Sequence, residues 1–156
     1  MVYQTRASYY RVALLLGVVS GDNVHEWATQ AIERDASPPR SVIDLALIPT
    51  SDLTELRHAL WTLAVEPEPP QVLRAVLGTI QADVASGRRT LADTVTMLRQ
   101  MRSMVRLPVD FHEAIGEHVN AHMLATAGVR GSLIAVEATI VEWLQRFAQE
   151  RLETVA

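Results

Sequence analysis

Residues 12–47, VALLLGVVSGDNVHEWATQAIERDASPPRSVIDLAL, decide the fold. Ser20 stands directly before a stretch of helical periodicity, where its hydroxyl can accept a hydrogen bond from a backbone amide of the first turn. Apolar residues then recur at helical spacing until Pro38 and Pro39, which end the helix because neither can donate a backbone hydrogen bond. The stretch therefore predicts the end of one helix, a capped turn, a second helix and a proline break.

A third segment follows the prolines, where residues 42–48 form a nearly continuous apolar run with Asp44 as its interruption. Such a short run fits either a buried strand or a short helix, and periodicity does not separate the two. We expect a helix, because every neighbouring segment has helical periodicity.

The remaining chain continues the helical pattern, with a first helix over 4–19 and a last one over 132–153. We predict an all-α protein of about eight helices and no strand, with short loops that make sequential helices antiparallel neighbours. No repeat with a clean period is visible, although solenoid-like stacking of helical pairs remains open. The proline-rich segment 66–70 divides the chain into two helical halves. Each half is small, so we expect residues 1–156 to form one domain.

Composition removes several classes of function. The chain has 156 residues, 49% of them hydrophobic, and no cysteine, so it has no disulfide framework and no zinc-thiolate site. All 14 basic residues are arginine, which excludes a Schiff-base lysine and the lysine of a phosphate-binding loop. The net charge of −4 argues against a general nucleic-acid binder.

The first residues allow two interpretations. Arg6 and Arg11 precede the apolar run 12–19, as in a short signal peptide. Three tyrosines within the first ten residues favour a first core helix instead. No apolar run reaches the ~18 residues that a membrane span needs, so we predict no membrane span and a cytoplasmic protein.

His118 and His122 are the sharpest candidate for chemistry. Four residues apart on a helix, the two imidazoles project from one side and could together bind a divalent transition metal. Two ligands do not make a site, and nothing fixes the distance to a third imidazole. The alternative interpretation is a pair of residues at the edge of a helix interface, with no cofactor in the protein.

Two further sets of residues could contact a partner. Arg99, Arg102 and Arg106 fall near one helix face, where they could bind phosphates or an acidic protein, or form an ordinary solvated face. No aromatic residues interleave with them, which makes nucleic-acid binding the weaker hypothesis. The three tryptophans are expected to anchor the core, with a partner interface as the alternative, and Trp143 of the last helix is the one we assign to it.

The order of these features resembles a family of uncharacterised bacterial all-helical proteins. The resemblance rests on V-x-E-W-A at residues 24–28, on the two prolines with VIDLAL, on the S-G-R at 86–88 and on a closing IVEWLQRF. It spans residues 12–147 and carries no catalytic motif. Proteins of this sort look like small immunity or accessory proteins of bacterial interference systems, which implies a protein partner and occlusion of that partner.

The leading hypothesis is therefore a non-enzymatic protein-interaction module, in the narrower form an immunity-type binder of a partner protein in a bacterial system. It predicts a contiguous exposed apolar patch. The alternative is a metal-dependent helical-bundle enzyme that uses His118 and His122 with a third ligand. A homo-oligomer is compatible with either.

Overall fold

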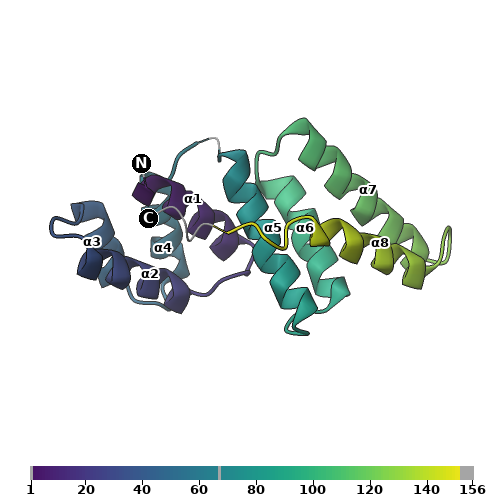
Figure 1. Ribbon diagram of the computed structural model, residues 1–156, viewed down its shortest axis with the longest axis horizontal. Coiled ribbons are helices and arrows are strands. Elements are labelled where there is room, and N and C mark those ends of the chain that lie inside the picture. Colours follow the sequence, from purple (N-terminus) through teal and green to yellow (C-terminus); the bar gives the residue numbers. More distant parts are fainter. Residues whose placement is uncertain (1, 67, 152–156) are drawn as a thin grey trace. The chain divides into compact units, whose positions relative to one another are not determined.

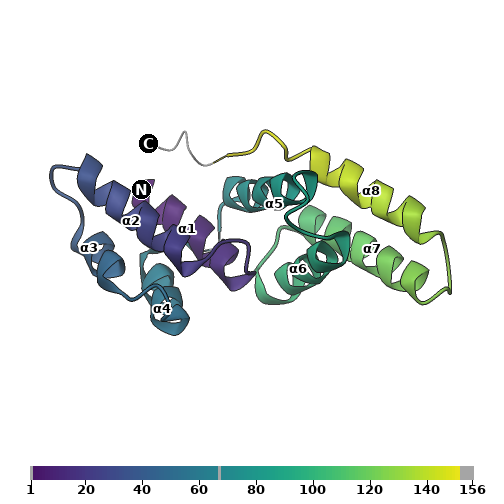
Figure 2. The same ribbon diagram turned by 90° about the horizontal axis from the view of Figure 1, so that it is seen from below.

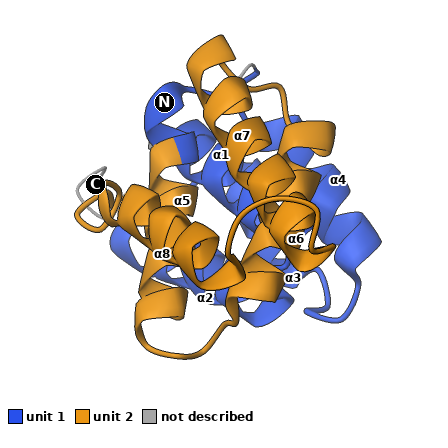
Figure 3. Cartoon of the chain, turned by 90° about the vertical axis from the view of Figure 1, so that its right-hand side faces the viewer, with its two compact units in different colours: residues 1–73, 152–156 blue, residues 74–151 orange. Residues whose placement is uncertain are grey.

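The computed structural model describes residues 2–66 and 68–151, which form eight α-helices and no strand (Figure 1). The all-α prediction is thus confirmed for this part of the chain. The chain divides into two compact units (Figure 3): among the described residues, unit 1 contains those up to Leu73, and unit 2 covers Arg74–Arg151. The boundary falls a few residues beyond the proline-rich segment 66–70. That residues 1–156 act as one domain stays a prediction.

Unit 1 contains α1 (Val2–Leu15), α2 (Gly21–Arg34), α3 (Arg40–Leu47) and α4 (Leu53–Leu63). Helix α1 packs on α4, and α3 contacts both α2 and α4. The apolar run after the two prolines is α3, so the helical interpretation of that segment is confirmed. The core of unit 1 consists of Ala7, Leu14, Val24, Trp27, Ala28, Val42, Leu45, Leu56 and Leu60.

Two of the tryptophans lie in unit 1 and have different environments. Trp27 is buried and stacks on Tyr10, with ring centroids 5.0 Å apart. Trp61 is 58% exposed, so the expectation that it anchors the core is wrong. The buried face of α4 is defined by Leu56 and Leu60, and Trp61 follows Leu60 on the outer side of the helix.

The chain between the two units is anchored on α1. The Ser8 hydroxyl accepts a hydrogen bond from the Val65 amide at 2.8 Å. Arg11 forms ion pairs with Glu66, at 2.9 Å, and with Glu68, whose side chain is 2% exposed. The guanidinium also lies 4.7 Å from the centroid of the Trp61 ring, outside the core. One arginine thus holds both glutamates of the proline-rich segment.

Unit 2 begins within α5 (Pro70–Ala85) and continues through α6 (Leu91–Met104), α7 (Val109–Thr126) and α8 (Leu133–Gln145). Helix α7 packs on α6 and on α8, which lies beside it in both views (Figures 1 and 2). Helices α5 and α8 are joined by a hydrogen bond that the side-chain Nε2 of Gln81 donates to the side-chain Oε1 of Gln145, at 3.0 Å. Fully buried residues of unit 2 include Leu77, Ile80, Leu98, Met101, Ile115, Ile140 and Leu144.

Three helices end in the same glycine turn, with φ of 74°, 74° and 70° at Gly17, Gly87 and Gly128. In each case the amide after the glycine bonds to a carbonyl five residues earlier, at 2.8 to 2.9 Å. This left-handed cap provides hydrogen bonds to the last carbonyls of the helix. Glycine adopts the left-handed conformation readily because it has no Cβ. It ends α1 at Leu15, four residues before the predicted end at Val19.

Other predicted helix ends also need correction. Helix α7 begins directly after Pro108, with no side-chain cap, and Asp110 lies in its first turn. Helix α8 ends at Gln145, short of the predicted Glu153, which lies outside the described residues. The cap expected at Ser20 is confirmed, and Thr90 forms the same kind of cap on α6. In both cases the hydroxyl accepts a hydrogen bond from the backbone amide three residues later.

The two units repeat one order of elements. In each, a helix ends in a glycine turn, a Ser or Thr caps the next helix three residues later, and a proline directly precedes the third helix. Gly17 and Ser20 correspond in this way to Gly87 and Thr90. The helices also pack in the same order, because α2 on α3 and α3 on α4 correspond to α6 on α7 and α7 on α8. The structure thus contains an architectural repeat that has no clean period in the sequence.

Candidate functional site

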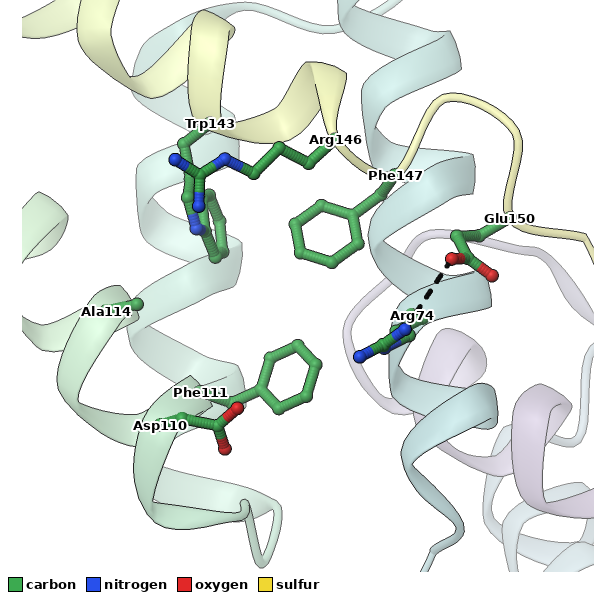
Figure 4. Close-up of a pocket in the computed structure, with 8 residues that line it drawn as sticks. All are labelled: Arg74, Asp110, Phe111, Ala114, Trp143, Arg146, Phe147 and Glu150. Carbon is green, nitrogen blue, oxygen red and sulfur yellow. Dashed lines mark ion pairs between the residues drawn. The ribbon is translucent and has the colours of Figure 1, made fainter.

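A pocket of about 350 Å³ opens on unit 2, where α5, the start of α7 and the end of α8 meet (Figure 4). The size falls at the lower end of the range for small-molecule sites. Gly78 of α5 lets the chain after α8 pass close to this helix, because a Cβ at Gly78 would lie 2.6 Å from the Glu150 carbonyl oxygen. The lining residues are Arg74, Asp110, Phe111, Ala114, Trp143, Arg146, Phe147 and Glu150.

An aromatic cluster forms the apolar wall of this pocket. Trp143 and Phe147 lie one turn apart and make an edge-to-face contact at 5.2 Å, and Phe111 of α7 lies 6.2 Å from Phe147. The centroid of the His118 ring lies 4.9 Å from that of the Trp143 ring. The three larger rings are at most 9% exposed. Trp143 therefore serves both the core and the pocket wall.

Charged groups surround the opening (Figure 4). Arg74 and Glu150 form an ion pair with a nitrogen–oxygen distance of 3.9 Å. Asp110 and Arg146 make no ion pair with any other described side chain. The pocket thus joins an apolar wall to one carboxylate and one guanidinium that remain available, an arrangement suited to binding an amphipathic group.

The two histidines of α7 have separate partners. Burial against Trp143 lowers the pKa of His118, with a smaller opposing effect from Glu117. His122 faces α8 instead, where its Nε2 lies 3.8 Å from a carboxylate oxygen of Glu137. The described residues contain no group of three or more histidine, aspartate or glutamate side chains that could hold a metal ion. Metal binding by His118 and His122 stays a prediction without a third ligand in this part of the chain.

The predicted arginine stripe is divided by the packing of α6 on α7. Arg102 lies across Gly116 of α7, and its Nε donates a hydrogen bond to the His112 carbonyl at 3.2 Å. This guanidinium therefore fastens two helices together. Arg99 and Arg106 are exposed. Whether they contact a partner stays a prediction.

A second feature of unit 2 is the hairpin formed by the end of α7, the glycine turn and the start of α8. No residue over 116–139 is buried, yet half of this segment is apolar, and its charged residues are Glu117, Arg130 and Glu137 alone. Ile134 is 83% exposed, and the other large exposed apolar residues of the segment are Met123, Val129 and Leu133. We call this segment the extended hairpin.

The corresponding hairpin of unit 1 is much shorter. In the hairpin of α3 and α4, the stretch without a buried residue covers only residues 46–55, between the buried Leu45 and Leu56. The shared arrangement of helices therefore forms without an extension of this kind. Met123, Val129 and Ile134 are more than half exposed, so their apolar character does not serve the core of unit 2.

Sequence reasoning located the last helix but missed the extended hairpin. Its signal is present in the sequence as a long segment that is both apolar and poor in charge. None of the described helices combines the length and apolarity that crossing a membrane requires. Comparison with known protein families, curated proteins and solved structures finds no match to this chain. The resemblance to bacterial all-helical proteins stays a prediction.

Proposed function

We propose that the chain is a non-enzymatic protein-interaction module that docks another polypeptide through the extended hairpin. The observation that carries the proposal is an apolar segment, residues 116–139, in which no residue is fully buried and whose counterpart in unit 1 is much shorter. Such a segment supports docking because contiguous exposed apolar surfaces mark interaction sites in soluble proteins. Covering a side chain such as Ile134 on binding contributes about 1–2 kcal/mol.

The resemblance supports a narrower form of the proposal, an immunity-type binder that occludes a partner protein in the cytoplasm of a bacterium. The metal-dependent alternative has less support, because His118 packs on Trp143 and His122 faces Glu137 with no third ligand among the described residues. The pocket of unit 2 could serve as a secondary contact, where Trp143 offers an aromatic wall to a side chain of the partner.

The test compares two exposed apolar residues. Tagged full-length protein captures its partner in an extract of the native host, and the bound protein is identified by mass spectrometry. Ile134→Asp should abolish capture, whereas Leu47→Asp should not, since Leu47 is 76% exposed but lies on α3 of unit 1. Neither variant should lower the melting temperature by more than a few degrees, because the wild-type side chains are exposed. Capture that is unchanged in Ile134→Asp would refute docking through the extended hairpin.

A further inference from the structure

The outward side of α8 carries a narrow apolar stripe. Ile134 and Val141 are 83% and 39% exposed, and Ala138 between them is also exposed. Steps of four and three residues place these side chains on one side of the helix. Ile140 and Leu144 are fully buried and lie roughly 90–130° around the helix from the stripe, on its core-facing side. Helix α8 therefore has one apolar face in the core and a second in water.

This spacing is the one found where two helices meet along a seam. The small side chain of Ala138, between the larger Ile134 and Val141, would allow the backbone of a second helix to approach closely. The stripe covers about two turns, which is the length over which a short amphipathic helix can insert its own apolar residues. Its geometry thus favours a helix over an extended peptide.

The charges beside the stripe indicate which charged side chains a partner helix would need next to its own apolar residues. Glu137 directly precedes Ala138 and Glu142 directly follows Val141, so at about 100° per residue the two carboxylates flank the stripe on opposite sides. Glu142 is exposed and forms no ion pair with any described residue. Glu137 lies 3.8 Å from His122, its only described ionic contact.

The other charges nearby lie at the two ends of the stripe. Arg130 precedes α8 in the glycine turn, and Arg146 follows its last residue beside the pocket. The middle of the stripe is therefore acidic on both flanks. A second copy of the same stripe would bring like charges together, which is unfavourable, whereas basic residues at the flanks of another helix would complement them.

Resting on the proposed function, we propose that the partner presents an amphipathic helix with an apolar stripe flanked by lysine or arginine, which docks along Ile134, Ala138 and Val141. The acidic flanks then select for such a helix and increase its rate of association. Apolar contact along the stripe supplies the affinity.

The test uses two fluorescently labelled helical peptides with the same leucines at i, i+4 and i+7, flanked by lysine in one and by glutamate in the other. Anisotropy titrations with the full-length protein should show the lysine-flanked peptide binding about tenfold more tightly, with an advantage that shrinks as salt increases. Ile134→Asp should abolish binding, and Leu47→Asp should leave it unchanged. Replacing both glutamates, Glu137→Gln with Glu142→Gln, should reduce the preference to about twofold or less.

Equal binding of the two peptides, or a preference that survives the double glutamine variant or Ile134→Asp, overturns the inference. If the protein binds neither peptide but self-associates in sedimentation experiments, and Ile134→Asp prevents this, the occupant is a second copy. The proposed function would then survive and the inference would fail. If neither peptide binds, and capture of the partner from the host extract is unchanged in Ile134→Asp, then both the proposed function and this inference fail.

Discussion

Replacing Arg11 by methionine should strongly destabilise the protein. Arg11 pairs with Glu68, whose side chain is 2% exposed, and methionine keeps the apolar stem of the side chain while removing its charge. The carboxylate of Glu68 would then remain buried without its cation. Loss of one partner of a buried ion pair costs about 3–5 kcal/mol, a large share of the ~5–15 kcal/mol that stabilises a typical domain.

The other contacts of Arg11 contribute less to stability than its ion pair with Glu68. Glu66 has a side chain that is 51% exposed, so its ion pair with Arg11 contributes less than about 1 kcal/mol. The contact between the guanidinium and the exposed ring of Trp61 contributes about 0.5–1 kcal/mol. Glu66→Gln and Trp61→Ala are therefore matched controls, each expected to cost a fraction of what Arg11→Met costs.

Urea denaturation at neutral pH, followed by circular dichroism, measures these differences, and the melting temperature of Arg11→Met should fall by about 6–20 °C. The double variant Arg11→Met with Glu68→Met should recover much of the loss, because neither buried charge then remains. A cost below about 1 kcal/mol for Arg11→Met, or a double variant no more stable than the single one, would show that Glu68 does not depend on this cation.

Three further predictions concern local contacts. Gly21→Ala should destabilise unit 1 by about 1–3 kcal/mol in the same denaturation assay, since a Cβ would lie 2.0 Å from the Thr50 carbonyl oxygen; an unchanged midpoint would contradict this. The pKa of Asp35 is lowered, chiefly by the hydrogen bond from Tyr3, so its contribution to stability should be present above the unfolded pKa and lost as pH falls through the folded pKa. Tyr3→Phe should bring the carboxyl pKa, measured by NMR, back toward its ordinary range, and an unmoved pKa would exclude the bond as its cause. Burial lowers the pKa of His118, so this histidine should reduce stability as pH falls below its unfolded value near 6.5; His118→Gln should make stability less sensitive to pH there, and an identical pH profile would refute this.

Local signals in the sequence were enough to place the helices. Ser20, Thr90 and the two prolines after α2 act on backbone groups within a few residues, so their effect can be derived without knowing the fold. The glycine cap of α1 was missed for the opposite reason. Gly17 stands within an apolar run whose hydrophobicity resembles a continuing helix, and its left-handed conformation appears only in the backbone.

Much of the candidate site depended on contacts between residues distant in the sequence. The pocket joins Arg74 to residues near 110 and near 147, and no spacing along the chain indicates that these segments meet. Spacing did place His118 and His122 on one side of a helix, but their partners, Trp143 and Glu137, come from α8. The arginine stripe was likewise divided only by the packing of α6 on α7.

By itself, the sequence determined an all-helical chain, the caps and prolines that bound several of its helices, and which chemistry the missing cysteine and lysine exclude, because these follow from backbone bonding and composition. Only the tertiary structure decided which apolar faces are covered. Trp61 and Ile134 are large apolar residues like those of the core, yet they are 58% and 83% exposed. The hydrophobicity of a residue can be read from the sequence, whereas its burial depends on which residues pack around it in the fold. The proposed docking surface consists of apolar residues that the fold leaves exposed.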